Sequence, residues 1–200
     1  DVVDDSNERR GFFSINAIWK SKIAVLLGDY LLAKGLLLAI HHKEFDILSY
    51  ISDAVKEMTE GELLQIKNSR KISISKDQYF EIIRKKTAAL LSCCSASGAR
   101  SVGAPDEMIK KMHHFGEQLG IAFQIKDDLL DYQIDNNTGK PSGHDLKERK
   151  LTLPLIHALE MAPSAEKKRI LRLLNHSTAN LQEFHEVRSF VEKYEGLTFA

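Results

Sequence analysis

The sequence predicts an all-α protein, and three observations lead to this prediction. Apolar residues recur at three- and four-residue spacing through most of the 200 residues, as on the buried face of a helix. No run alternates apolar and polar residues as a half-buried strand does. One long polar loop, residues 133–150, interrupts the helical pattern. Together these features favour a helical bundle around one core.

Four long segments carry the helical spacing, and shorter amphipathic segments follow them. We expect long helices over residues 20–41, 44–67, 76–100 and 105–132, and shorter ones from about residues 153, 164 and 180. Ser75 and Gln78 form the pattern of a capping box, and Pro105 suits the first turn of the fourth long helix. Gly28 in the first of these segments and Gly116 and Gly120 in the fourth interrupt the helical pattern, and we expect all three to permit close helix approach.

The composition is that of an ordinary globular protein, and we expect residues 1–200 to form a single domain. Lys plus Arg and Asp plus Glu both number 28, so no overall field favours nucleic acid. The longest uninterrupted apolar runs are only a few residues, so we expect no transmembrane segment. Cys93 and Cys94 are adjacent, which disfavours the geometry of a disulfide between them, and reduced thiols agree with a cytoplasmic location.

Three carboxylates form a DDxxD pattern inside the fourth predicted helix, in Asp127-Asp128-Leu129-Leu130-Asp131. A helix places Asp127 and Asp131 on one face, about 5 to 6 Å apart at Cβ. Like charges at this spacing repel, and Asp is a poor helix former. Magnesium ions carrying substrate phosphates would offset this cost. A second acidic cluster, Asp1-Val2-Val3-Asp4-Asp5, is followed by the arginine pair Arg9-Arg10.

With these motifs the chain resembles the trans (E-type) polyprenyl diphosphate synthases. In that family the first DDxxD motif precedes an arginine pair, and the second precedes a Gly-Lys-x-x-Gly-x-Asp loop, here Gly139-Lys140-Pro141-Ser142-Gly143-His144-Asp145. Further patterns follow in the family's order: Gly28-Asp29-Tyr30-Leu31-Leu32, Glu62-Leu63-Leu64-Gln65, Lys86-Thr87 and Lys150-Leu151-Thr152-Leu153-Pro154. One acidic motif alone is weak, but the ordered set is specific and covers essentially the whole chain.

The resemblance implies an isoprenoid-synthase-type bundle around a central cavity and a prenyltransferase activity. An allylic prenyl diphosphate would lose diphosphate, and isopentenyl diphosphate would attack the resulting carbocation head to tail, giving a longer all-trans polyprenyl diphosphate. Mg²⁺ is the implied cofactor, and a homodimer is the implied assembly. By the same resemblance the chain is an internal piece of a longer enzyme, since the first aspartate of the first motif would precede Asp1 and residues 194–200 resemble the start of a further helix.

Site residues follow from the resemblance by position. The implied metal ligands are Asp1, Asp4, Asp127 and Asp131. The implied cations for the substrate diphosphates are Arg9, Arg10, Lys86, Lys140 and Lys150. The implied groups near the reacting carbons are Thr87 and Gln124, which with Lys86 make up the expected catalytic set, and Gln124 would also contact substrate.

Two alternatives stay open. A terpene cyclase of the same fold normally pairs one aspartate-rich motif with an Asn/Ser/Glu metal motif, whereas the second motif here is DDxxD followed by a lysine loop. A non-catalytic partner subunit that binds prenyl diphosphates has no reason to retain both acidic clusters. In both cases the motifs of the chain favour the transferase over the alternative.

Overall fold

The computed structural model describes residues 8–9, 12–69, 75–133, 150–176 and 181–200. The chain divides into two compact units, residues 1–49 and 50–200. Most of the predicted polar loop, residues 134–149, lies outside the described residues. That residues 1–200 act as one domain stays a prediction.

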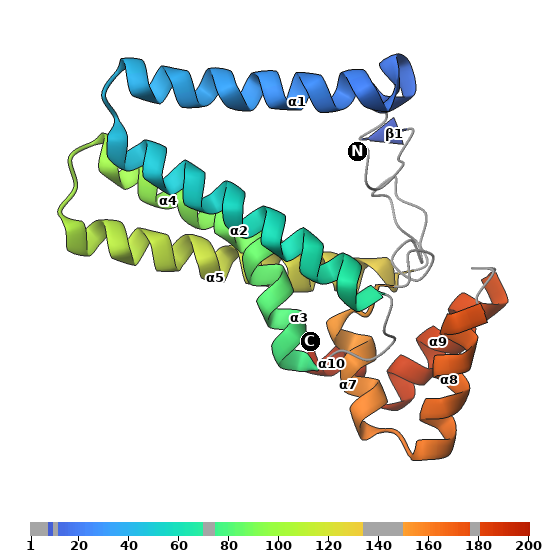
Figure 1. Ribbon diagram of the computed structural model, residues 1–200. Helices are drawn as coiled ribbons and strands as arrows, with labels where there is room; N and C mark the ends of the chain where they lie inside the picture. The colour runs from blue at the N-terminus through green and yellow to red at the C-terminus, as the bar shows by residue number, and fades with distance from the viewer. Residues whose placement is uncertain (1–7, 10–11, 70–74, 134–149, 177–180) are drawn as a thin grey trace. The chain divides into compact units, whose positions relative to one another are not determined.

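The first unit contains a short strand pair and one long helix (Figure 1). β1 (Glu8–Arg9) pairs antiparallel with β2 (Phe12–Phe13), a ladder too short to produce the alternation that marks a strand in sequence. α1 (Ile15–His41) begins after Ser14, whose hydroxyl accepts a hydrogen bond from the Ala17 N–H at 3.1 Å. Lys20, with φ 66° and ψ 161°, forms a kink inside this span, so the continuous part of the helix begins where the sequence predicted it, and residues 15–19 form an additional turn before the kink.

Helix α1 is apolar around most of its circumference. By length and composition alone it is able to cross a membrane, because Asp29 and Lys34 are the only Asp, Glu, Lys or Arg residues in α1 after Lys22. The short uninterrupted apolar runs of the sequence did not indicate this property of α1. The core helix of a soluble protein has the same length and composition, so the absence of a transmembrane segment stays a prediction.

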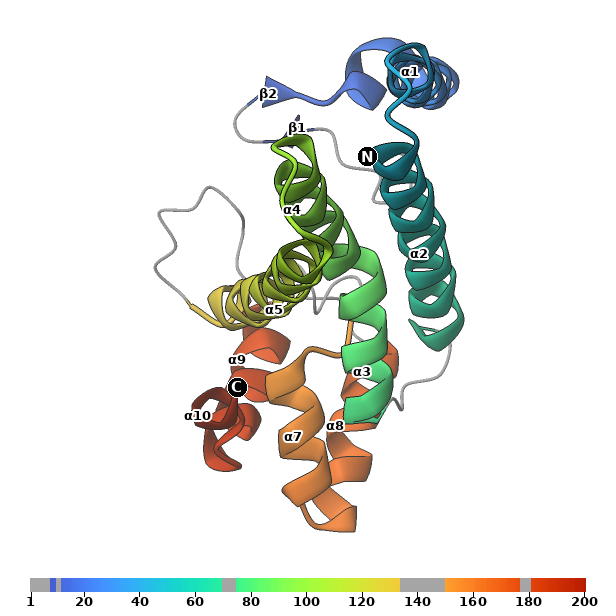
Figure 2. The same cartoon turned by 90° about the vertical axis from the view of Figure 1, so that its left-hand side faces the viewer.

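The second unit is helical throughout its described residues (Figures 1 and 2). Its elements are α2 (Phe45–Ser69, which begins in the first unit), α3 (Lys76–Ile83), the π-helical turn η1 (Arg84–Ala88), α4 (Ala89–Ser101), α5 (Asp106–Asp131), α7 (Leu153–Met161), α8 (Ser164–His176), α9 (Leu181–Lys193) and α10 (Gly196–Phe199). The predicted capping box begins α3, with the Ser75 hydroxyl accepting from the Gln78 N–H at 3.2 Å and the Gln78 side chain accepting from the Ser75 N–H at 3.0 Å. The predicted all-α class and the long helices are confirmed, whereas the predicted helix 76–100 is interrupted by η1.

Helices α4 and α5 pack side by side, and glycines on α5 make their close approach possible (Figures 1 and 2). A Cβ added at Gly116 would lie 2.5 Å from the Leu91 carbonyl oxygen and 2.7 Å from Ser92 Cα. A Cβ added at Gly120 would lie 2.5 Å from Ala88 Cα. The neighbours are backbone atoms, which a side-chain rotation cannot move away, so Gly116 and Gly120 fulfil the predicted role. A Cβ added at Gly28 would meet no described atom within 4 Å, so the prediction of close approach there is wrong for the described residues.

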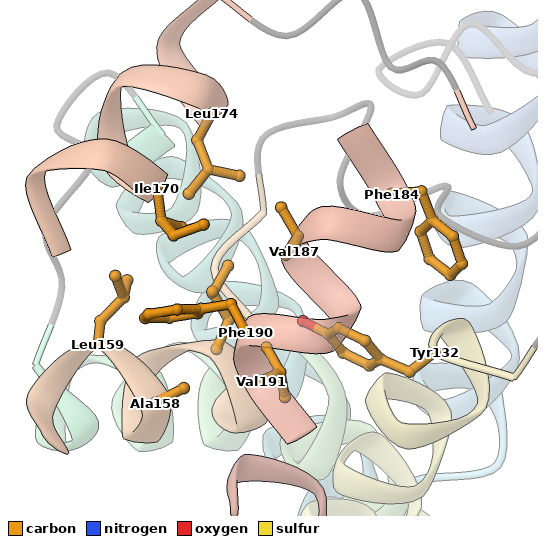
Figure 3. Close-up of a cluster of buried hydrophobic side chains, with 10 residues drawn as sticks. Tyr132, Ala158, Leu159, Ile170, Leu174, Phe184, Val187, Phe190 and Val191 are labelled. Atoms are coloured by element: carbon orange, nitrogen blue, oxygen red, sulfur yellow. The ribbon is translucent and has the colours of Figure 1, made fainter. Parts of the chain in front are cut away.

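The C-terminal helices share one hydrophobic cluster, which also holds the end of α5 (Figure 3). Its fully buried members include Leu155 on α7, Ile170 on α8 and Val191 on α9. Tyr132, the residue that ends α5, inserts its ring into the same cluster. The last turn of α5, which carries the DDxxD aspartates, is therefore anchored to α7 and α9.

A second contact joins α3, α7 and α10. The His157 imidazole stacks on the Phe199 ring, with centroids 3.9 Å apart and planes within 4°. Lys76 Nζ lies 3.1 Å from His157 Nδ1 and 2.9 Å from the Glu160 carboxylate. Burial, and then the charge of Lys76, lower the pKa of His157 below its ordinary value of 6.5.

We expect Gly116→Ala to lower the free energy of unfolding by about 1 to 3 kcal/mol, because the added methyl group overpacks α4. Gly98→Ala is the matched control on α4, since its added Cβ would meet no described atom within 4 Å. There the change should stabilise by about 0.5 to 1 kcal/mol through helix propensity. Urea unfolding of both variants measures the difference, and equal effects would contradict the packing role of Gly116.

The lowered pKa of His157 predicts a pH-dependent stability. The unfolded chain takes up the proton more readily than the folded protein, so this contribution is fully present above pH 6.5 and is lost as pH falls below it. Urea unfolding at several values between about pH 5 and pH 7 should show a steeper decline for the wild type than for His157→Phe, which keeps a ring against Phe199. Parallel curves for the two proteins would disprove the assignment.

Candidate functional site

The π-helical turn η1, between α3 and α4, carries two predicted site residues, Lys86 and Thr87. It also carries Lys85, the neighbour of Lys86 in the chain. A π turn adds a residue to the helical repeat, and such turns are frequent at functional sites. Lys86 Nζ donates to the Gln65 side-chain oxygen at 2.8 Å and pairs with Glu62 at 2.7 Å, both on α2. The two elements contact closely because Gly61 has no side chain. A Cβ at this position would lie only 2.7 Å from the Lys86 backbone nitrogen.

Lys85 has different partners on the same helix. Its Nζ lies 2.6 Å from the Glu60 carboxylate and 3.3 Å from that of Glu57. The hydrogen bond with Glu60 raises the pKa of Lys85 and lowers that of Glu60. Lys85 and Lys86 are thus neighbouring half-buried cations, each neutralised by α2. Only Lys86 stands beside Thr87 in the predicted pattern.

Thr87 connects the π turn to α5. Its hydroxyl donates to the Gln124 side-chain oxygen at 3.0 Å. The Gln124 amide nitrogen in turn donates to Asp128 at 3.1 Å, four residues further along α5. The structure therefore brings together two members of the predicted catalytic set, Thr87 and Gln124, and places Lys86 next to them in the chain.

Three aspartates of the DDxxD motif have two different environments. Asp127 and Asp131 are half-buried, four residues apart near the end of α5. Asp128 is 4% exposed and accepts hydrogen bonds from Gln124, from the Tyr79 hydroxyl and from the Leu153 N–H. The two outer carboxylates are the ones whose spacing suits a shared cation, while the middle one is an internal hydrogen-bond acceptor.

A small hollow brings Lys150 near the end of α5. Asp131, Lys150 and Thr152 line this hollow together with apolar residues of α7 and α9. Lys150 is half-buried and directly precedes the segment that begins α7. Of the two predicted diphosphate cations whose side chains the structure describes, Lys86 and Lys150, the latter lines the same hollow as a DDxxD aspartate.

Several predicted residues lie outside the described residues, or have side chains that are not described. They are Asp1, Asp4, Arg9, Arg10 and Lys140, of which Arg9 contributes backbone to β1. Among the described residues, no group of three or more His, Cys, Asp or Glu side chains is placed to hold a metal ion. The predicted metal site stays a prediction, because two of its four predicted ligands lie outside the described residues.

Sequence reasoning missed the partners that hold the site residues. Glu62 and Gln65 were noted as a pattern, but their contact with Lys86 was not predicted. Tyr79 carried no sequence signal, because its contact with Asp128 joins residues 49 positions apart. Asp128 itself lies in the motif. Its position one residue after Asp127 already indicated that its side chain faces away from the side shared by Asp127 and Asp131.

Comparison with solved structures confirms the fold class. The decaprenyl diphosphate synthase of Rhodobacter capsulatus matches with a TM-score of 0.91 at 35% identity, over 100% of this chain and 62% of that one. A polyprenyl synthase of Caulobacter crescentus, solved with calcium and isoprenyl diphosphate, matches with a TM-score of 0.89 at 33% identity, over 100% and 61%. The fold is thus the all-α fold of the polyprenyl synthases.

Sequence comparison identifies the family. A sequence model described as polyprenyl synthetase matches residues 1–191, and the chain belongs to this family. The geranylgeranyl diphosphate synthase of Sulfolobus acidocaldarius is 34% identical over 97% of this chain and 61% of its own length. The short chain isoprenyl diphosphate synthase of Methanothermobacter thermautotrophicus is 31% identical over 100% and 62%. The chain thus spans about three fifths of the length of these relatives.

Proposed function

We propose that this protein is a prenyltransferase that condenses isopentenyl diphosphate head to tail with an allylic prenyl diphosphate. The products are a longer all-trans polyprenyl diphosphate and diphosphate. The observation that carries this proposal is the joining of Thr87 to Gln124, beside Lys86 and one helical turn before the aspartates of α5. This arrangement sets cations and carboxylates for a diphosphate next to neutral oxygens for a carbocation.

Separation of the diphosphate is the demanding step, because charge develops on a group that already carries several negative charges. Lys86 is held by Glu62 and Gln65 and is able to exchange these partners for diphosphate oxygens. Lys140 and Lys150 are proposed as further cations for the leaving group, and Arg9 and Arg10 as the forks that bind the two substrates. Electrostatic stabilisation of this kind is commonly the largest contribution to catalysis.

The donor atoms of the predicted metal ligands fit Mg²⁺. Asp127 and Asp131 offer carboxylate oxygens, which hard cations prefer, and neither is fully buried. We propose that they hold magnesium together with Asp1, Asp4 and the substrate phosphates. Bound there, magnesium would neutralise the diphosphate oxygens. The calcium in the Caulobacter crescentus structure is also a hard divalent cation.

Thr87 and Gln124 would act at the other end of the scissile bond. The Gln124 oxygen and the Thr87 hydroxyl are uncharged dipoles, so they are able to stabilise a developing cation electrostatically. Loss of a proton to the released diphosphate or a nearby base would then complete each condensation. Lys86, Thr87 and Gln124 are therefore the proposed catalytic set.

We propose that the protein forms a homodimer with a second copy of itself. We also propose that it is located in the cytoplasm and does not bind nucleic acid. A different partner subunit is the competing assembly, because the relative from Geobacillus stearothermophilus, 36% identical over 80% of this chain, is named heptaprenyl diphosphate synthase component 2. Size-exclusion chromatography with light scattering of the natural protein, alone and after purification from its host, separates the two assemblies.

The activity is tested on the full natural chain with Mg²⁺, labelled isopentenyl diphosphate and a panel of allylic primers. We expect labelled prenyl chains in the wild type and a loss of about 100-fold or more in Asp127→Ala, because a carboxylate for the metal is removed. Asp53→Ala, at an exposed position on α2, should behave as wild type. An allylic primer consumed to a hydrocarbon without elongation would indicate a terpene cyclase, and no consumption would indicate a non-catalytic subunit.

Lys86 and Lys85 provide a matched pair for diphosphate binding. Calorimetry with inorganic diphosphate and Mg²⁺ should show at least about tenfold weaker binding for Lys86→Met, since a charge-assisted hydrogen bond is lost. Lys85→Met removes an equally half-buried lysine with acidic partners on the same helix. It should leave the affinity within about twofold, because the Lys85 charge is engaged by Glu57 and Glu60 and is not part of the proposed diphosphate site. Equal losses in both variants would contradict a specific role for Lys86.

A further inference from the structure

Asp128 does not share the environment of the two aspartates around it. Its Oδ2 accepts from the Tyr79 hydroxyl at 2.7 Å and from the Leu153 N–H at 3.2 Å. Its Oδ1 accepts from the Gln124 amide at 3.1 Å. All three partners donate to a carboxylate that is almost completely removed from solvent. The side chain is thus engaged with three different elements, α3, α5 and α7.

One of these bonds satisfies an N–H group in the first turn of a helix. Leu153 is the first residue of α7, and its N–H has no acceptor within the helix. The N-cap residue, Thr152, makes no side-chain capping bond, because its hydroxyl pairs with the Tyr132 hydroxyl at 2.7 Å. The carboxylate of Asp128, which comes from another helix, accepts from the Leu153 N–H, and its charge suits the positive end of the helix dipole.

The other side of the carboxylate determines which way the Gln124 amide points. A carboxylate accepts hydrogen bonds and does not donate them, so Gln124 must turn its nitrogen toward Asp128. Its oxygen then points to Thr87. The Thr87 hydroxyl accepts or donates equally well, so Thr87 by itself does not fix the amide.

We propose that Asp128 is a positioning residue that keeps the Gln124 oxygen, and not its nitrogen, directed toward Thr87 and the reacting carbons, and that the Tyr79 hydroxyl holds Asp128 in place. The inference rests on the proposed prenyl transfer. The oxygen end of the amide stabilises a carbocation, whereas the N–H end repels it. Asp128 therefore acts on the reaction through Gln124 and touches no substrate.

Asp128→Asn is a sharp test because the backbone N–H of Leu153 cannot be reversed. The oxygen of the introduced amide must stay opposite Leu153 and Tyr79, so its nitrogen faces Gln124. Gln124 must then turn by 180° and direct its N–H group to Thr87. We expect kcat to fall by about 100-fold with KM for the allylic diphosphate within about twofold, since the substrate diphosphate contacts are unchanged. A kcat within about twofold of wild type would overturn the proposal.

Two tyrosines separate positioning from stability. Tyr79→Phe and Tyr132→Phe each remove one buried hydroxyl that hydrogen-bonds at 2.7 Å near the start of α7. Only the Tyr79 hydroxyl contacts Asp128. We expect similar losses of thermal stability, but a three- to tenfold lower kcat for Tyr79→Phe alone, about the effect of one hydrogen bond. A similar kcat loss in Tyr132→Phe would overturn the role of Tyr79 and reduce Asp128 to a structural residue.

A second substitution should restore the orientation. In the Asp128→Asn background, Gln124→Glu supplies a carboxylate that accepts from the introduced amide and still presents an oxygen to Thr87. The double variant should be at least about tenfold more active than Asp128→Asn, although Gln124→Glu alone places two carboxylates side by side and should be impaired. A double variant no better than either single variant would overturn the proposal.

A readout without turnover keeps the inference separate from the proposed function. In protein labelled with ¹⁵N-glutamine, the Gln124 side-chain signal is assigned by its loss in Gln124→Glu. It should exchange slowly with solvent in the wild type and in Tyr132→Phe, and shift markedly in Asp128→Asn. If no prenyl transfer occurs but these shifts do, the proposed function fails and the orientation by Asp128 stands. If transfer occurs and the signal is unchanged in Asp128→Asn, the inference fails alone.

Discussion

The backbone contact between Gly120 and Ala88 sets the geometry on which the candidate site depends. Ala88 follows Thr87 in the chain, and Gly120 precedes Gln124 by one helical turn. An added Cβ at Gly120 would lie 2.5 Å from Ala88 Cα, so no larger residue fits without separating the two helices. Because Thr87 and Gln124 share a 3.0 Å hydrogen bond, a separation of even one ångström would break it. Close packing is thus a requirement of the chemistry proposed for these residues as well as of the fold.

Polar contacts of Asp128 and packing of Tyr132 then hold the end of α5 in place. Asp128 joins α5 to α3 and α7, while Tyr132 holds the same end of α5 in the C-terminal cluster. Asp127 and Asp131 therefore project from a turn whose buried side is bound at several points. Preorganised carboxylates lose little entropy when a cation binds, which is an advantage for a site that must also accommodate substrate phosphates.

The sequence predicted the helices well, because long amphipathic segments have a strong period, and the capping box at Ser75 is local. It also identified Gly116 and Gly120 as close-contact positions. The π turn at 84–88 was not predicted, since Arg84-Lys85-Lys86-Thr87-Ala88 reads as ordinary helix and its extra residue is set by packing against α2 and α5. The role of Asp128 was hidden for a related reason: its partners Tyr79 and Leu153 are 49 and 25 residues away, and no local pattern records such contacts.

The π turn has a consequence for how α3 and α4 share one axis. Each residue of a regular α-helix advances the side-chain direction by about 100°, so one surplus residue rotates everything beyond it relative to everything before it. The turn therefore acts as a phase shift between two helical surfaces, with Tyr79 on one side of it meeting α5 at Asp128 and Ser92 on the other side meeting the backbone of α5 at His113. Removing a residue here would put one of these surfaces out of phase with α5, so the length of this segment is constrained more strictly than the identity of its exposed side chains.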